Sequence, residues 1–119
     1  MQPIGVLVIE EGAEAALICA ALLKTPNVRV VGAPNVRAAL ERLKTEHAAL
    51  AFVGAGALAD VKQLHSRGIP VVAVVPELPP AARERALAAG VQEVHERPAD
   101  WRAYSELIDS VVSRFIPPS

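Results

Sequence analysis

The chain has 119 residues, of which 52% are hydrophobic and only 3% aromatic, a composition that indicates one domain with a core of small aliphatic side chains. Its 12 basic and 13 acidic residues give a net charge of -1, which argues against a nucleic-acid partner held through phosphate contacts. The apolar runs are far shorter than the roughly 20 residues of a membrane-spanning helix, and the chain starts without the basic region of a signal peptide. We therefore expect a cytoplasmic protein with no membrane partner.

The first half of the chain predicts two strand-helix units and a third strand. Residues 4–9 are continuously apolar and rich in β-branched side chains, which is typical of a strand buried on both faces. A helix is predicted over 13–24, and Asn35 is a suitable N-cap for a helix over 36–46. Further strands are predicted over 28–31 and 49–53.

The second half repeats the same alternation of strands and helices. Strands are predicted over 69–75 and 91–96, and the second of these is polar enough for an edge position. Gly90 is a suitable C-terminal cap for the helix between them. The last helix carries Tyr104, Leu107 or Ile108, Val111 and Phe115 at helical spacing, a pattern typical of a core-facing stripe. Helices are predicted over 58–66, 81–89 and 100–115.

Five strand-helix units over residues 1–119 predict a single α/β domain with helices on both faces of a parallel sheet. The common doubly wound order for five strands is 2-1-3-4-5, which leaves a crevice at the carboxyl ends of strands 1 and 3. We therefore expect any functional residues at the ends of strands.

The strand ends carry a resemblance that spans almost the whole chain. The residues 8–11, 50–53, 69–72, 88–91 and 97–98 resemble, in order and spacing, the receiver domain of two-component response regulators, which has a flavodoxin-like fold. The resemblance implies phosphoryl transfer from a histidine kinase to an aspartate of the receiver, close to a bound Mg²⁺.

The residues of that chemistry are largely replaced in this chain. By the resemblance, the metal-binding acidic pair falls on Glu10 and Glu11, the phosphoacceptor aspartate on Gly54, the hydroxyl residue on Val75, the switch aromatic on Val94 and the lysine on Arg97. Glycine offers no oxygen to phosphorylate, and Asp60, Asp100 and Asp109 all fall in or at the start of predicted helices. The sequence thus predicts a degenerate pseudo-receiver, not an enzyme, that works in signal transduction by phosphorylation-independent protein-protein interaction.

Glu10, Glu11 and Arg97 are expected to converge at neighbouring strand ends. A salt bridge from Arg97 to one of these carboxylates is either an ordinary surface ion pair or a substitute for the metal and the phosphate. The two glutamates are weak candidates for Mg²⁺ or Ca²⁺, but an adjacent pair without a third ligand holds such ions poorly. We therefore expect no metal and no other cofactor.

A second hypothesis is a small-ligand or nucleotide-binding module. The run Gly54-Ala55-Gly56-Ala57-Leu58-Ala59 matches the glycine-rich turn of dinucleotide-binding folds, and Glu77 follows at a suitable spacing. The competing interpretation is that this loop is shortened and that the glycines only let it turn.

The remaining candidates concern partners and reactive side chains. His47, His65 and His95 do not share a metal-ligand spacing, and Cys19 is expected to be a small buried residue of a helix. Trp101 fits either the centre of an interface or a plug at the start of the last helix. The face formed by the fourth helix, fifth strand and fifth helix is the expected surface for a protein partner, a signalling effector or a homodimer. Its candidate residues are Arg83, Arg85, Val94, His95, Trp101, Arg102 and Glu106.

Overall fold

The computed structural model of the chain describes residues 3–10 and 13–116, and within them five strands form one parallel sheet of order β2-β1-β3-β4-β5. The predicted α/β fold and strand order are therefore confirmed. The strands are β1 (Ile4–Ile9), β2 (Val28–Ala33), β3 (Leu50–Val53), β4 (Val71–Val75) and β5 (Glu93–Glu96). The helices are α1 (Ala13–Leu22), α2 (Val36–Arg42), the 3₁₀ helix η1 (Ala55–Asp60), α3 (Val61–His65), α4 (Pro80–Ala89) and α5 (Trp101–Phe115).

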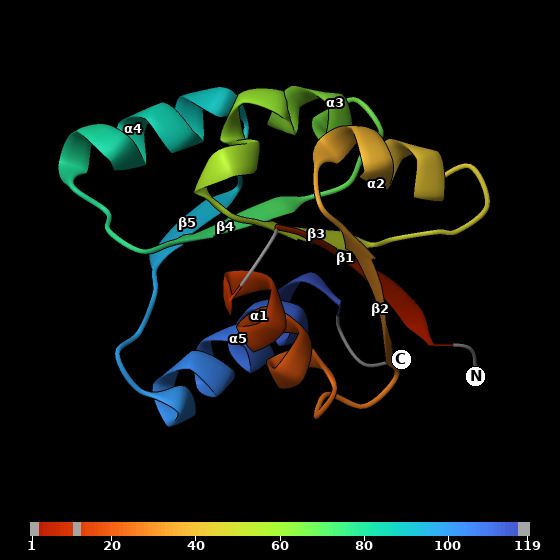
Figure 1. Cartoon of the computed structure of the whole chain (residues 1–119), viewed down its shortest axis with the longest axis horizontal. Helices are drawn as coiled ribbons and strands as arrows, with labels where there is room; N and C mark the ends of the chain where they lie inside the picture. Colours follow the sequence, from red (N-terminus) through yellow and green to blue (C-terminus); the bar gives the residue numbers. More distant parts are fainter. Residues whose placement is uncertain (1–2, 11–12, 117–119) are drawn as a thin grey trace.

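The helices form two layers, one on each face of the sheet. Figure 1 shows α1 and α5 together below the sheet and α2, α3 and α4 above it. In this arrangement the chain enters the sheet at β1, moves to the edge with β2 and then crosses to β3 on the other side. The ends of β1 and β3 consequently flank the point at which the winding changes direction.

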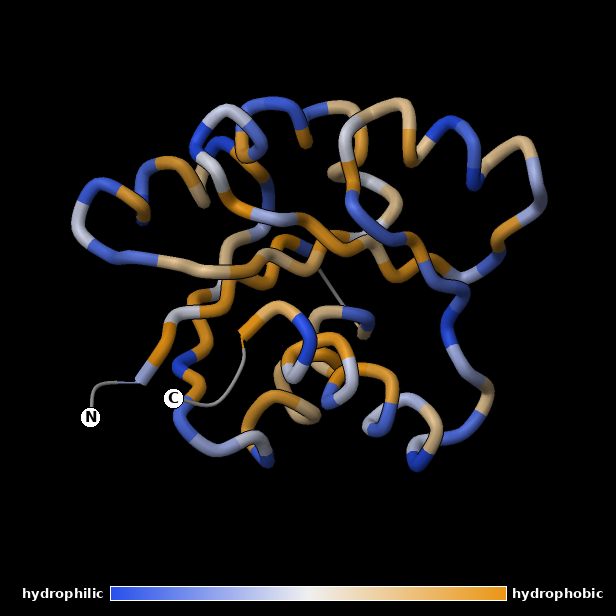
Figure 2. The backbone as a smooth tube through the Cα atoms, turned by 180° about the vertical axis from the view of Figure 1, so that it is seen from behind, coloured by the Kyte–Doolittle hydropathy of each residue, from blue (hydrophilic) through white to orange (hydrophobic). Residues whose placement is uncertain are grey.

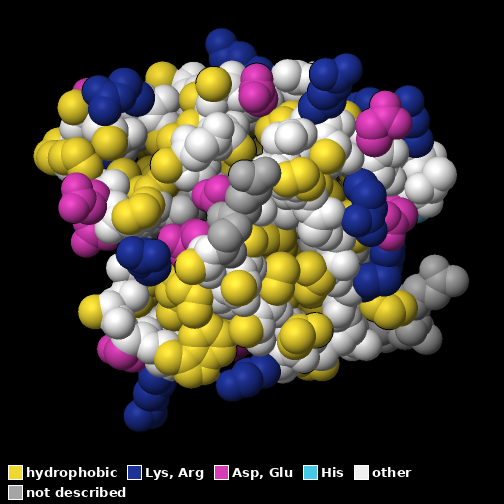
Figure 3. Space-filling model, viewed as in Figure 1, with side chains coloured by type: hydrophobic (Ala, Val, Ile, Leu, Met, Phe, Trp, Pro, Cys, Tyr) yellow, Lys and Arg dark blue, Asp and Glu magenta, His cyan; other side chains and the backbone are white. Residues whose placement is uncertain are grey.

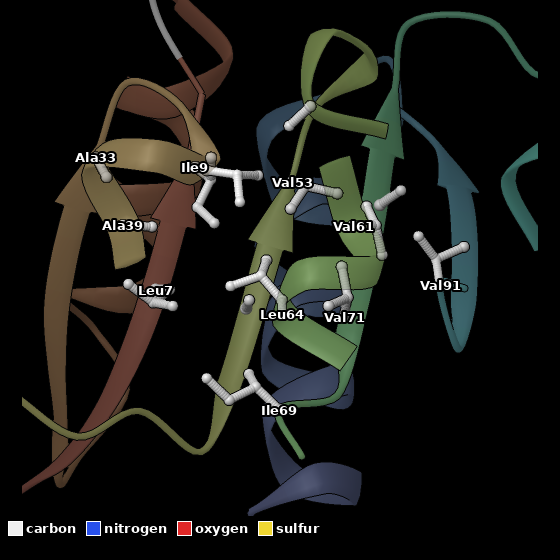
Figure 4. Close-up of a cluster of buried hydrophobic side chains, with 14 of the residues drawn as sticks. Leu7, Ile9, Ala33, Ala39, Val53, Val61, Leu64, Ile69, Val71 and Val91 are labelled. Carbon is white, nitrogen blue, oxygen red and sulfur yellow. The ribbon is translucent and has the colours of Figure 1, made fainter. Parts of the chain in front are cut away.

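Two hydrophobic clusters pack on opposite faces of the sheet because successive side chains of a strand point to opposite sides. Leu7, Ile9 and Val71 face α2 and α3, where they pack with Leu64 of α3 (Figure 4). The other cluster joins the sheet to α1 and α5. Its fully buried members include Val6, Val8, Ile18, Phe52, Val72, Tyr104 and Ile108. The strands accordingly run as a mostly hydrophobic band through the centre of the molecule (Figure 2).

Several element boundaries differ from those predicted. β2 continues to Ala33 because it pairs with β1 as far as Ile9. β4 begins after Pro70, which has no N–H for the ladder. β5 begins two residues later than expected because the N–H of Val91 still donates to the Ala86 carbonyl at 3.4 Å, closing the end of α4.

The helices also differ in length. The α1 helix ends at Leu22 and α2 at Arg42, each followed by turns rather than by the last helical residues predicted. The predicted helix over 58–66 forms as η1 followed by the short α3. No helix within the described ranges is both long enough and apolar enough to cross a membrane.

The helix caps follow the sequence. Asn35 Oδ1 accepts from the N–H of Ala38 at 2.8 Å, and Asp100 Oδ1 accepts from the N–H of Ala103 at 2.9 Å. Gly90 adopts φ 113°, the left-handed conformation in which glycine is not strained, and this ends α4 as predicted. These caps fix where α2, α4 and α5 start or stop relative to the strand ends.

Candidate functional site

The residues predicted at the strand ends lie along one edge of the sheet. Glu10 follows β1, Gly54 follows β3 and Arg97 follows β5, while Val75 ends β4. Backbone hydrogen bonds extend the ladder to this edge, from Gly54 N–H to the Ile9 carbonyl at 3.4 Å and from Arg97 N–H to the Val75 carbonyl at 2.8 Å. These hydrogen bonds fix the backbone positions of Gly54 and Arg97 relative to the neighbouring strands β1 and β4. Glu11 lies outside the described residues.

The space beside Gly54 is filled by Glu10. A Cβ atom added to Gly54 would overlap the Glu10 carboxylate oxygen Oε2 and come within 3.1 Å of Glu10 Cγ. Gly54 itself is buried and has an extended backbone, with φ −96° and ψ −177°, that any residue can adopt. Gly54 thus leaves a space that the end of the flexible Glu10 side chain occupies, and its backbone conformation does not itself demand glycine.

The two valines of the site are parts of the core. Val75 is 5% exposed and Val94 is 2% exposed, and both belong to the cluster beneath α2, α3 and α4. Val75 has no hydroxyl to donate. The prediction that Val94 contributes to a partner surface is wrong, because its side chain points from β5 into the hydrophobic cluster.

Arg97 faces a carboxylate that the sequence analysis did not single out. Its guanidinium nitrogen Nη1 lies 3.5 Å from Oε1 of Glu14, and the other oxygen of Glu14 accepts a hydrogen bond from the hydroxyl of Tyr104. Glu14 is only 9% exposed, whereas the side chain of Arg97 is 40% exposed. An arginine salt bridge at this edge was predicted, but the carboxylate comes from within α1 rather than from the end of β1.

The hydrogen bond to Glu14 has an electrostatic consequence for the phenol. Burial raises the pKa of Tyr104 far above its ordinary value of 10.0, and the bond to Glu14 raises this pKa further. Both effects disfavour the phenolate, since it would be a buried anion beside another anion. The phenol therefore acts as a hydrogen-bond donor, and Glu14 is held between this donor and the Arg97 cation.

A signal for Glu14 was present in the sequence. It is the single charged residue of α1, whose sequence is AEAALICAAL. A buried charge in an otherwise apolar helix needs an opposite charge or a hydrogen-bond donor nearby to offset its desolvation. The partners of Glu14 could not be identified from the sequence, because they depend on how α1 packs against α5.

A cleft of about 420 Å³ lies beside this cluster, between α1 and the loop that leads into α5. The Trp101 ring borders it, 38% of the residue is exposed, and the ring stacks on Tyr104 with centroids 6.2 Å apart. The ammonium group of Lys24 lies over the Trp101 ring, 5.2 Å from the ring centroid. Trp101 therefore covers part of the core and is also partly open to a partner. The cleft is lined by Leu17, Pro76, Arg97, Pro98, Ala99, Asp100, Trp101 and Tyr104.

The crevice predicted at the ends of strands 1 and 3 is present and acidic. A cavity of about 220 Å³ is lined there by Glu10, Asp60 and Gly56, among others. Gly56 leaves open space, but the turn forms a 3₁₀ helix of six residues, and two carboxylates repel a phosphate. The geometry of the glycine-rich turn therefore disfavours a pyrophosphate.

The receiver resemblance implies a Mg²⁺ ion at this edge, and the described residues, which do not include Glu11, do not supply a complete donor set for it. Mg²⁺ requires oxygen ligands in near-octahedral geometry. Gly54 supplies no side-chain oxygen, and Glu14 is already engaged with Tyr104 and Arg97. Within the described part of the chain, no three His, Cys, Asp or Glu side chains gather as metal ligands would.

The predicted partner surface wraps around the edge strand β5. Arg83 and Arg85 are exposed on α4, whereas Arg102 and Glu106 are exposed on α5, in the opposite layer (Figure 1). His95 is half-buried between them, with Nε2 2.8 Å from Oε1 of Glu93. Because Glu93 also binds Arg114 through two hydrogen bonds, the middle of this surface is an ion cluster.

The remaining histidines and the cysteine lie apart from the site. His47 and His65 are exposed, in a loop and at the end of α3. Cys19 is half-buried in α1, and burial raises the pKa of its thiol. A raised pKa leaves the thiol protonated and weakly nucleophilic.

Comparison with known proteins identifies relatives by fold. No protein-family model and no curated protein matches the chain. Among solved structures, the phosphorylated cyanobacterial phytochrome response regulator RcpA matches with a TM-score of 0.80 at 16% identity, over 98% of this chain and 96% of that one. A response regulator from Thermotoga maritima matches with a TM-score of 0.76 at 19% identity, over 95% of this chain and 99% of that one.

An orphan response regulator of H. pylori also matches, with a TM-score of 0.72 at 16% identity, over 94% of this chain and 96% of that one. At such identities the likeness shows the fold alone. The chain therefore has the flavodoxin-like fold of response-regulator receiver domains.

Proposed function

We propose that this chain is a signal-transduction protein of receiver fold that acts through protein-protein contacts without phosphorylation of an aspartate, and that it is not an enzyme. One observation carries the proposal: the carboxylate of Glu10 fills the space beside Gly54, where the receiver resemblance places the phosphoacceptor. A phosphoryl group at this point would need an acceptor oxygen and would have to displace an anion.

The other parts of the site support the same conclusion. Phosphoryl transfer depends on a metal ion and on hydrogen-bond donors directed at the phosphoryl oxygens. The side chain of Val75 is buried and offers no donor, and Arg97 is directed toward Glu14. Arg97 is thus paired with a carboxylate of the same chain rather than available for a phosphoryl group. This pairing favours a surface of constant structure over one that changes on phosphorylation.

The proposal includes the partner class and the location. With a net charge of -1, the chain lacks the excess of basic residues that would favour nucleic acid or an anionic membrane. The proposed partner is accordingly another protein, and the proposed location of the chain is the cytoplasm. A nucleotide is not favoured, because the crevice beside the glycine turn is lined by Glu10 and Asp60.

Incubation with acetyl phosphate and Mg²⁺, followed by intact-mass analysis at neutral pH, tests the proposal. We expect the mass to stay unchanged, while an active receiver treated in parallel gains one phosphoryl group. Any acid-stable or labile phosphoryl adduct on the wild-type chain would overturn the proposal.

A matched variant identifies the chemistry if an adduct forms. Glu10→Gln keeps the shape of the side chain that fills the Gly54 space but removes its carboxylate. We expect neither the wild type nor Glu10→Gln to gain mass. An adduct present on the wild type and lost in Glu10→Gln would show that the glutamate itself has become the acceptor.

A further inference from the structure

The outer face of α1 carries no charge, which is unusual for a helix at the surface. Surface helices normally place charged side chains opposite their buried stripe. The single charged residue of α1, Glu14, points inward to Tyr104, so the outward positions are apolar and include Ala13 and Ala16. By contrast, α4 exposes Arg83, Glu84 and Arg85.

Larger apolar side chains continue this surface beyond α1. Leu23, in the turn after the helix, is 79% exposed, and Trp101 is 38% exposed beside the 420 Å³ cleft. Figure 3 shows hydrophobic side chains gathered over α1 and the start of α5, with basic side chains at their margin. An apolar surface with a polar margin is typical of an interaction site.

The same surface has a protruding leucine and a cleft with one apolar side. The Leu23 N–H donates to the Cys19 carbonyl at 3.0 Å, so the leucine is held in an ordered turn before any partner binds. The cleft is lined on its apolar side by Leu17, Pro98 and Trp101. Lys24 joins the two features, since it follows Leu23 and its ammonium lies over the Trp101 ring.

We propose that a second copy of this chain covers this surface, with Leu23 of each protomer seated in the cleft beside Trp101 of the other. A two-fold axis pairs every protrusion with its matching hollow, so one surface that carries both is complementary to itself. The same surface also carries opposite charges, Lys24 next to the leucine and Asp100 in the lining of the cleft, so that its two parts are complementary in charge. The inference rests on the proposed function, because a second copy is one kind of protein partner.

This surface suits a homodimer better than the face formed by α4, β5 and α5. The centre of that face holds the ion pair of Glu93 and Arg114, with His95 within hydrogen-bond distance of Glu93, and the two charges of the pair would have to be desolvated in an interface. Leu87, 46% exposed on α4, is a large exposed hydrophobic residue of the other helix layer. It therefore provides a matched control on the opposite side of the sheet.

Sedimentation equilibrium over a wide concentration range tests the inference. We expect the wild type to dimerise and Leu23→Glu to weaken the dimer by about tenfold or more, because it replaces the apolar contact with Leu17, Pro98 and Trp101 by a desolvated charge. Leu87→Glu makes the same change of side chain and should leave the dissociation constant unchanged. A wild type that stays monomeric throughout, or a dimer weakened by Leu87→Glu and not by Leu23→Glu, would overturn the inference.

A mixing experiment tests the two-fold arrangement itself. Ala99 is exposed and lines the cleft, so Ala99→Trp should fill the hollow without disturbing the core. A mixture of Leu23→Glu and Ala99→Trp restores one intact contact, since the first variant supplies an open cleft and the second a leucine. The mixture should associate more tightly than either variant alone, and equal or weaker association would contradict the reciprocal contact.

The two proposals fail separately. Far-ultraviolet circular dichroism of each variant shows whether it is folded, and the three substituted positions, Leu23, Leu87 and Ala99, are all exposed. A monomeric protein without a phosphoryl adduct would overturn the dimer and leave the proposed function standing. A dimeric protein that gains a phosphoryl group would overturn the proposed function and leave the dimer standing.

Discussion

The hydrogen bond from Tyr104 to Glu14 shows how a single buried charge is accommodated. The carboxylate is 9% exposed and lies between the phenol of α5 and the guanidinium of Arg97. Removal of one partner of a buried charge costs more than the bond itself contributes, because the remaining group is left desolvated. Tyr104→Phe is therefore expected to lower the free energy of unfolding by about 1–3 kcal/mol in urea denaturation.

The raised pKa of Tyr104 also predicts that the protein loses stability at high pH. Its folded-state pKa lies above the ordinary value of 10.0, with burial as the main cause and Glu14 as the second. The stabilising contribution is complete below pH 10 and is lost as the pH rises above it, since only the unfolded state gains by ionising. Because Tyr104 is the single tyrosine, ultraviolet absorbance follows its ionisation alone. We expect tyrosinate to appear together with alkaline unfolding, and ionisation near pH 10 in the folded protein would contradict this.

At the scale of whole elements, the start of α5 determines the shape of the cleft. Asp100 is in an extended conformation and its side chain accepts the N–H of Ala103, so the helix begins at Trp101. This position directs the indole ring toward Tyr104 and Lys24. The cap thus connects the stability of α5 with the surface proposed for the second copy.

Replacement of the cap gives a prediction for this element. Asp100→Ala should lower the free energy of unfolding by about 1 kcal/mol, because one N–H of the first turn loses its acceptor. Asp109→Ala removes the same carboxyl group from an exposed position within α5 and should change stability by less than about 0.5 kcal/mol. Thermal or urea denaturation followed by circular dichroism measures both variants, and equal losses would show that the cap makes no specific contribution.

For the whole molecule, one sheet is shared by two hydrophobic clusters. Every strand contributes side chains to the cluster beneath α2, α3 and α4, and β1, β3 and β4 also contribute to the cluster beneath α1 and α5. Neither layer can lose its packing without exposing one face of the same strands. The two clusters should therefore unfold together as one cooperative unit.

Leu64→Ala tests this coupling. Leu64 is fully buried against the sheet on the face opposite Trp101, and its truncation should cost about 2–5 kcal/mol. Trp101, the single tryptophan, reports on the other layer by fluorescence. We expect the urea midpoint from fluorescence to fall as much as the midpoint from circular dichroism, and an unchanged fluorescence midpoint would mean that the layers unfold independently.

The fold followed from local patterns that the tertiary structure leaves unaltered. Continuous apolar runs marked the strands, and Asn35 and Gly90 marked helix ends because a cap acts within a few residues of itself. Boundaries such as the start of β4 at Val71 depended on hydrogen bonds with neighbouring strands. They could not be predicted to the residue from one segment alone.

The amino-acid sequence by itself determined the order of elements and the absence of an aspartate at Gly54, since these depend on residue identity and on the short range of helix and strand signals. The strand order followed from the regular winding of parallel sheets built from strand-helix units. The tertiary structure decided which charges meet. Arg97 reaches Glu14, separated from it by 83 positions, because α1 and α5 pack side by side on one face of the sheet. It also decided that Glu10 fills the space of the missing side chain, because such contacts depend on side-chain directions that only packing fixes.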